Sequence, residues 1–232
     1  MQEVNGYEEA KAMELLADAK RRKPDADPAL RFFGTLISFI FHPLFIPFYI
    51  TCFLVFVHPF AFPGMDEKVK IFRVISVFLL TAFFPAFTVF LLKQLHFISS
   101  IYLNTQKERI IPYIAAMFFY FWIFYVSRNL VDSSPLFVML MLAVFISSIT
   151  SLMGNIYFKV SMHAIAMGVM LTFFVILALQ GDVAMGIFLA LAIVTAGVVC
   201  TARLLVSDHY PFEIYAGFLL GVLSQVLAMV FV

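Results

Sequence analysis

Long apolar runs separated by short polar segments fill the chain from residue 34 onward. A helix needs about 20 apolar residues to cross the hydrocarbon core of a bilayer. The third run is the shortest, so the pattern predicts an all-α, polytopic membrane bundle of six to seven transmembrane helices. The predicted spans are 34–58, 72–92, 111–127, 135–153, 162–180, 183–201 and 212–231.

Prolines mark the predicted starts and weak points of several spans. Pro135 and Pro211 stand where a run begins, and proline suits the first turn of a helix. Prolines inside a run favour a kink, because they remove a backbone N–H from the helix. Kinks are therefore expected in the first two runs, around His42, Pro43, Pro47 and Pro85.

The first 31 residues are polar and charged, without the early apolar core of a signal peptide. They predict a solvated tail at 1–31, whose basic segment Lys20–Lys23 rests near lipid headgroups, followed by one transmembrane domain at 32–232. The composition agrees with a chain solvated by lipid, because 63% of the residues are hydrophobic and 12% are charged.

The charge of the chain is small and unevenly placed. A net charge of +1 gives no reason to expect a nucleic-acid partner. Eleven of the 15 Lys and Arg residues lie in the tail and the even-numbered connections between spans, which places the tail in the cytoplasm. Cys52 and Cys200 lie in apolar runs and are expected to pack as small hydrophobes.

Three polar segments interrupt the apolar pattern, and their spacing predicts a common location. They are "KERIIP" (Lys107–Pro112), "KVSMHA" (Lys159–Ala164) and "ARLLVSDHYPFE" (Ala202–Glu213). Two spans separate each segment from the next, so all three emerge on the same membrane face. Charged groups at membrane depth are costly, and they usually mark a functional site.

The third segment contains the spacing of an activated histidine. His209 and Glu213 are four residues apart, so the carboxylate can accept the imidazole N–H on one helical face. The other ring nitrogen is then left as a base or nucleophile. Ser207 or Asp208 is expected to cap the helix that begins near Pro211. The competing interpretation is that the His209–Glu213 pair only caps this helix and has no catalytic role.

The other segments supply partners for an anion. Ser161 and His163 flank a predicted helix start, where free N–H groups favour a bound anion, and His163 can protonate a leaving oxygen. Arg109 and Arg203, with Lys159, can hold a phosphate through charge-assisted hydrogen bonds. Alternatively, these basic side chains extend to the lipid headgroups and bind no phosphate, and this interpretation is favoured for Lys107.

The remaining histidines carry no such pattern. His42, His58 and His96 lack charged neighbours at helical spacing and are expected to make buried polar contacts.

"ARLLVSDHYPFEIYAGFLLG" resembles the third signature of the type 2 phosphatidic acid phosphatase and vanadium haloperoxidase superfamily. That signature is Ser-Arg, five residues, His, three residues, Asp; Arg203, His209 and Glu213 match its spacing. "VSMH" is similar to the second signature, Pro-Ser-Gly-His, at Ser161 and His163.

"KERIIP" is a poorer match to the first signature, Lys, six residues, Arg-Pro, whose arginine Arg109 can represent. The resemblance covers roughly residues 107–221. The segment "FKVSMH" also resembles small membrane members of this superfamily from the Bacteroidetes. This resemblance implies that the protein lies in a bacterial inner membrane.

The resemblance implies a lipid phosphate substrate and a reaction without a metal ion or other cofactor. His209 would be the nucleophile that takes the phosphoryl group, with Glu213 orienting it, and His163 would be the general acid. The phosphoryl oxygens would be bound by Arg109, Arg203 and Ser161, with Lys159 or Lys107 replacing the signature lysine.

The sequence departs from the signatures at several positions. Glu213 replaces Asp, Ala202 replaces Ser, and Val160 and Met162 replace the Pro and Gly of the second signature. The expected function is hydrolysis of a lipid phosphomonoester or pyrophosphate, with phosphoryl transfer to another lipid as a variant. These departures leave open a non-catalytic protein that binds or transports a lipid phosphate.

Overall fold

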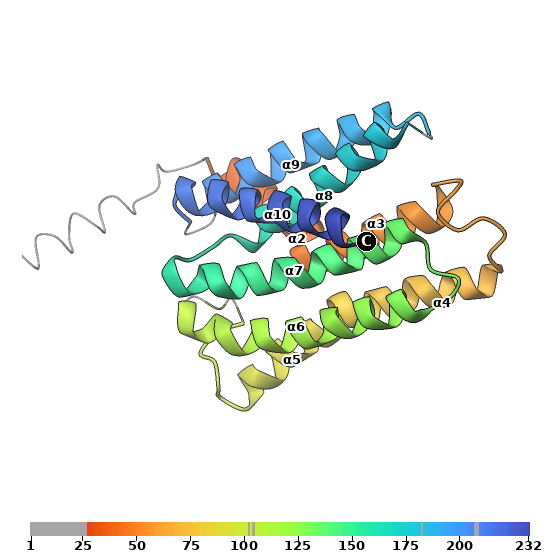
Figure 1. Ribbon diagram of the computed structural model, residues 1–232. Coiled ribbons are helices and arrows are strands. Elements are labelled where there is room, and N and C mark those ends of the chain that lie inside the picture. The colour runs from red at the N-terminus through yellow and green to blue at the C-terminus, as the bar shows by residue number, and fades with distance from the viewer. Residues whose placement is uncertain (1–26, 102, 104, 182, 207–208) are drawn as a thin grey trace, which may run out of the picture.

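The structure, a computed structural model, describes residues 27–101, 103, 105–181, 183–206 and 209–232 (Figure 1). The predicted interfacial segment Lys20–Lys23 and the predicted caps Ser207 and Asp208 lie outside these residues. Within the described residues the chain is helical, without strands, and seven helices are long and apolar enough to cross a membrane. The predicted class is confirmed, and the protein is an integral, multi-pass membrane protein.

Two of the seven spans are each built from two helices with a short turn between them. The first span contains α2 (Pro28–Ile40), a 3-10 turn (Pro43–Phe45) and α3 (Ile46–Phe56), and the second contains α4 (Glu67–Phe78), a π-helical turn (Leu79–Phe83) and α5 (Phe84–Gln94). The other spans are α6 (Gln106–Asn129), α7 (Pro135–Tyr157), α8 (Met162–Gln180), α9 (Gly186–Val206) and α10 (Pro211–Phe231).

Several predicted starts and breaks are confirmed. Helices α7 and α10 begin at Pro135 and Pro211. The first span breaks at Pro43, and the π-helical turn directly precedes the helix that contains Pro85. Such a turn lets a membrane helix adjust around the N–H that proline lacks.

The first polar segment lies inside a helix, whereas the sequence pattern placed it before one. Helix α6 begins at Gln106 because Thr105 and Glu108 cap it in both directions. Arg109 therefore stands in the first turns of a span, and Pro112 lies in the helix interior.

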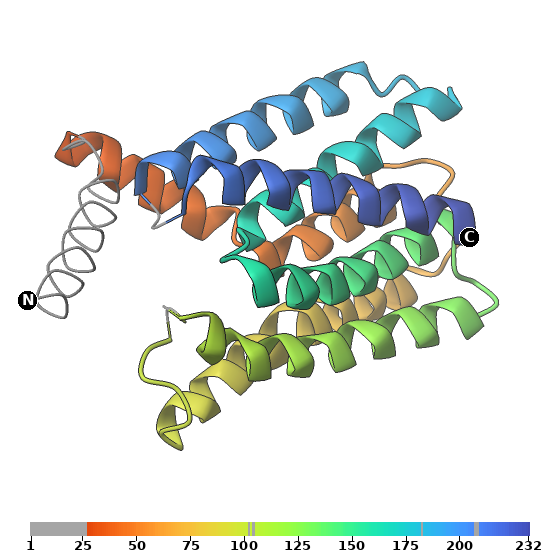
Figure 2. The ribbon, with the colours of Figure 1, turned by 60° about the vertical axis from the view of Figure 1, so that its left-hand side comes forward.

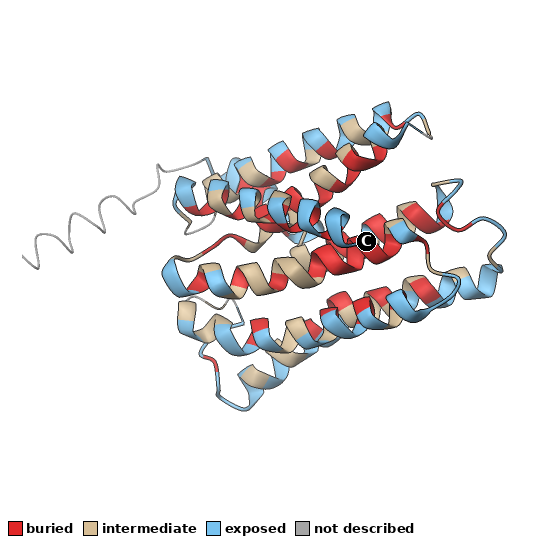
Figure 3. Cartoon of the chain, in the orientation of Figure 1, coloured by how far each residue is buried: buried red, intermediate tan, exposed pale blue. Residues whose placement is uncertain are grey.

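The helices lie side by side, and their connections gather at the two ends of the bundle (Figures 1 and 2). Helix α7 contacts α3, α6, α8 and α10, and the run Phe137–Val144 is buried. Buried residues concentrate between the helices, while outward faces such as those of α4 and α9 are largely exposed (Figure 3). Apolar side chains on the outside fit a bundle whose solvent is lipid.

Helices α8 and α10 approach each other with almost no side chain between their backbones. A Cβ added to Gly221 would lie 2.1 Å from the carbonyl oxygen of Ile165, and one added to Gly168 would lie 2.2 Å from that of Phe218. At Gly217 the same atom would lie 2.9 Å from the carbonyl oxygen of Ser161. Small residues at four-residue spacing allow this close packing in membranes.

At the opposite end of the bundle, the buried Arg73 of α4 joins the α3–α4 connection to the α6–α7 connection. Arg73 is paired with Asp132 at 2.9 Å and donates to the hydroxyl of Ser133 at 3.0 Å. Its guanidinium also lies over the rings of Phe62 and Phe137, at 4.8 and 5.3 Å from the centroids. Carboxylate and aromatic partners together make this cation a structural one.

The packing predicts that Gly221→Ala destabilises the protein. The new methyl group would overlap the backbone of α8, and overpacking of this kind costs about 1–3 kcal/mol. Thermal unfolding in detergent should show a clear loss in Tm. The matched control is Gly197→Ala in α9, where an added Cβ meets nothing within 4 Å. Equal Tm values for the two variants would contradict the close packing.

Candidate active site

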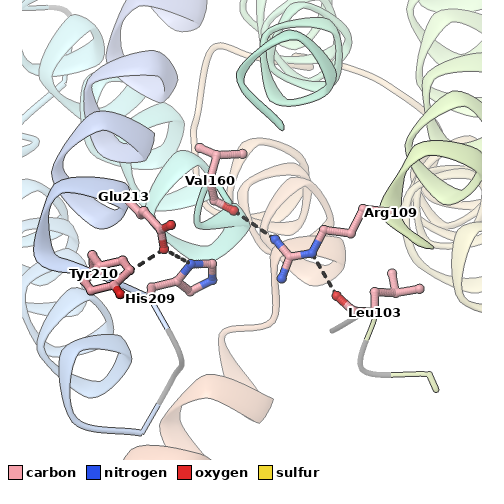
Figure 4. A network of polar contacts seen from close by, with 6 residues as sticks. All are labelled: Leu103, Arg109, Val160, His209, Tyr210 and Glu213. Carbon is pink, nitrogen blue, oxygen red and sulfur yellow. Dashed lines mark hydrogen bonds and ion pairs between the residues drawn. The ribbon is translucent and has the colours of Figure 1, made fainter. Parts of the chain in front are cut away.

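The three polar segments meet at one end of the bundle, as their spacing predicted. The start of α6, the α7–α8 connection and the start of α10 contribute Arg109, Val160 and His209 with Glu213 to one network (Figure 4). Residues separated by about a hundred positions in the chain are thereby neighbours at one membrane face.

His209 and Glu213 form the predicted pair. The Nδ1 atom of His209 lies 2.9 Å from Oε2 of Glu213, and the backbone N–H of Tyr210 donates to the same oxygen at 3.0 Å. The two side chains are only 5% and 10% exposed. Because the carboxylate accepts, Nδ1 carries the hydrogen, and Nε2 of the neutral ring is left with its lone pair.

The surroundings keep this imidazole neutral. Burial lowers the pKa of His209 below its usual 6.5, and the positive charges of Arg109 and Arg203 lower it further. The hydrogen bond to Glu213 opposes these effects by raising the pKa of the ring. With the net shift downward, the ring is unprotonated at pH 7, as a nucleophile requires.

Arg109 reaches the same place from α6. Its Nε donates to the carbonyl of Leu103 at 2.9 Å, and its Nη1 donates to the carbonyl of Val160 at 3.2 Å. The guanidinium and the ring of His209 point toward one another (Figure 4). Both bonds go to neutral acceptors, so the positive charge keeps its attraction for an anion. Lys107 is exposed at the start of α6.

Ser161 occupies the residue before α8, where the sequence placed a helix start. The residue is fully buried, and among the described residues its Oγ has no hydrogen-bond partner. Its backbone N–H donates to the carbonyl of Glu213 at 3.3 Å, which ties the second segment to the third. Lys159 stands half-buried two residues earlier in the connection. A buried hydroxyl without a partner can bind a ligand oxygen.

His163 and Arg203 meet on the first span. Nε2 of His163 lies 3.0 Å from the carbonyl oxygen of Ser38, and Nη1 of Arg203 donates to the hydroxyl of Ser38 at 3.4 Å. A carbonyl can only accept, so Nε2 of His163 carries a hydrogen. His163 also lies close enough to Arg203 and His209 for their charges to act on it.

Ser38 and His42 belong to this cluster, although helical spacing in the sequence did not indicate them. The ring of His42 lies 5.4 Å from that of His163, and Arg203 acts on it electrostatically. These neighbours come from other helices, because α2 packs along α9 and the 3-10 turn that follows His42 contacts α8. The His42–Pro43 break within an apolar run was the signal in the sequence.

Within the described residues, no three His, Cys, Asp or Glu side chains come together where they could hold a metal ion.

Comparison with protein-family models, with curated proteins and with solved structures found no match to the chain. The resemblance to the phosphatase superfamily therefore rests on the three polar segments themselves.

The lowered pKa of His209 predicts how the site responds to pH. The ring should become protonated only at a pH below the usual 6.5 of histidine, because the net shift of its pKa is downward. Glu213→Gln removes the charge that raises the pKa, so it should move the transition to still lower pH. Titration of isotope-labelled histidines by NMR in detergent measures both values without a substrate. A pKa at or above 6.5, or an upward shift in Glu213→Gln, would contradict the geometry.

Proposed function

We propose that the protein is an integral membrane phosphatase that removes phosphate from a lipid phosphomonoester or pyrophosphate, without a metal ion, through a phosphohistidine at His209. The observation that supports it most is the buried, neutral imidazole of His209, oriented by Glu213 and facing the guanidinium of Arg109. This arrangement has a nucleophile, its orienting carboxylate and a cation for the phosphate at one membrane face.

In the first step, Nε2 of His209 attacks the phosphorus and forms a P–N bond while the P–O bond to the lipid breaks. Glu213 stabilises the positive charge that develops on the imidazole by accepting from Nδ1–H. His163 is neutral in the free protein. The negative charge of the bound phosphate offsets the positive charge of Arg203, so His163 takes up a proton in the substrate complex and gives it to the leaving oxygen. Since its Nε2–H is held by Ser38, Nδ1 is the atom that exchanges the proton.

In the second step, water attacks the phosphohistidine. His163, now neutral, takes a proton from the water at Nδ1, the P–N bond breaks, and phosphate leaves with the lone pair restored to His209. Arg109 and Arg203 neutralise the phosphoryl oxygens in both steps, together with Lys159 and the hydroxyl of Ser161. A lipid alcohol in place of water would turn the same chemistry into phosphoryl transfer.

An apolar crevice beside the site supports a lipid substrate. It follows α3 and α8, and its lining residues include Pro43, Ile46, Ile50, Met162, Ile165 and Val169. Met162 stands between Ser161 and His163, so the crevice adjoins the phosphate-binding end. From Met162 to Val169 this lining rises about 10 Å along α8, the direction in which we expect the hydrocarbon chain of the substrate to lie.

The proposed location is a bacterial inner membrane, with the N-terminus in the cytoplasm. The excess of Lys and Arg in the tail and the even-numbered connections supports this orientation. Two spans separate each site segment from the next, so the site opens to the same face as the tail. A reporter fused to the N-terminus tests the orientation; a signal on the outer side would reverse it.

A non-catalytic lipid-phosphate binding or transport protein is the second candidate. Two donors of Arg109 are committed to backbone carbonyls, which favours this candidate, because fewer donors then remain to stabilise the charge that develops in a transition state. Val160 and Met162, in place of the Pro and Gly of the second signature, point the same way.

The proposal predicts phosphate release by the purified protein from at least one of four lipids: phosphatidic acid, phosphatidylglycerol phosphate, a polyprenyl pyrophosphate or a phosphorylated saccharolipid. The release should persist in EDTA and should disappear in His209→Ala, because the nucleophile is lost. Phosphate is measured in detergent micelles that contain each lipid.

His96→Ala is the matched control, because His96 lies outside the site. The prediction of a buried polar contact for His96 is wrong, since the residue is exposed. The rate of His96→Ala should equal that of the wild type. Binding of a lipid phosphate to the wild type with no release above that of His209→Ala would support the second candidate instead.

A further inference from the structure

The break in the first span gives the site a component that the three polar segments do not contain. Ser38 and His42 are four residues apart, at the end of α2 and the turn that follows it, and both contact His163 of α8. We propose that His42 is a positioning residue that sets the orientation of the His163 ring. This inference rests on the proposed function, in which His163 moves the proton.

His42 is itself held in place by the chain around it. Its Nδ1 accepts from the backbone N–H of Leu44 at 3.4 Å and so caps the 3-10 turn. Its ring meets the rings of Phe45 and His163 edge to face, at 6.3 and 5.4 Å between centroids. A rigid ring is therefore presented to His163 by a stretch whose backbone Pro43 restricts.

His163 is restrained from two directions by this stretch. The carbonyl of Ser38 accepts from Nε2, and the ring of His42 stands nearly perpendicular to that of His163, at an interplanar angle of 80°. Rotation of the His163 ring would lose the hydrogen bond to Ser38 and bring the ring against His42. The restraint fixes the Nε2–H tautomer and leaves Nδ1 for proton exchange.

A residue that only positions the proton-transfer group should affect kcat far more than KM. Ser38 contacts Arg203 through its hydroxyl, whereas His42 faces His163. Loss of the His42 ring should therefore leave phosphate binding nearly intact while it misplaces the acid. Misplacement by about 1 Å costs up to roughly 100-fold in rate.

Two substitutions separate the ring of His42 from its capping role. His42→Asn retains an acceptor for Leu44 N–H but has no ring, whereas His42→Phe retains the ring but has no acceptor. We expect kcat to fall by roughly 10- to 100-fold in His42→Asn with KM within threefold, and to stay within about threefold of wild type in His42→Phe. Wild-type kcat in His42→Asn, or an equal loss in both variants, would overturn the proposal.

His58→Asn is the matched control, because it makes the same change beyond the other end of the first span. Its kcat should equal that of the wild type, and thermal unfolding identifies any variant that does not fold.

A second readout does not depend on turnover. Nitrogen-15 NMR of the five histidines, with His163→Gln to assign the signal, should show the Nε2–H tautomer of His163 in the wild type and in His42→Phe, and a mixture of tautomers in His42→Asn. If no lipid phosphate is hydrolysed, the proposed function fails, yet this spectrum still tests the restraint. An unchanged tautomer in His42→Asn would refute it.

Discussion

The close approach of α8 and α10 is the contact on which the site depends. Because Gly168, Gly217 and Gly221 allow the two backbones to meet, the N–H of Ser161 can donate to the carbonyl of Glu213. That bond brings the residue before α8 next to the first turn of α10. The second and third polar segments thus share one set of backbone contacts, and the first joins them through Arg109 and the carbonyl of Val160.

Charged groups at the two ends of the bundle are satisfied in different ways. Arg73 has a carboxylate and two aromatic rings as partners, so its charge is largely compensated within the protein. Arg109 donates to two backbone carbonyls and, among the described residues, to no carboxylate. The carboxylate at the site end, Glu213, instead contacts His209. This division leaves a positive potential beside an imidazole that stays neutral, and the proposed phosphoryl transfer depends on both.

The sequence predicted the features that follow from local periodicity. The lengths of the apolar runs predicted the spans, and the two spans between successive polar segments predicted their common face. The four-residue spacing of His209 and Glu213 predicted their contact. The contributions of Ser38 and His42 depend on how the first span packs against α8 and α9, which no local pattern reveals. The same holds for the glycines of α8 and α10, since a four-residue spacing indicates close packing only once the partner helix is known. The start of α6 was missed because its capping residues are polar and lie outside the apolar run.

Chemical trapping of the intermediate tests the central claim most directly. The protein is mixed with a lipid phosphate that it hydrolyses and whose phosphate is isotopically labelled. The reaction is stopped in alkali, and the labelled peptide is identified by mass spectrometry. Phosphate on His209, absent from His209→Ala and turning over at least as fast as phosphate is released, is the result that this account predicts. Release of phosphate with no label on His209, or with the label on His163, would contradict it.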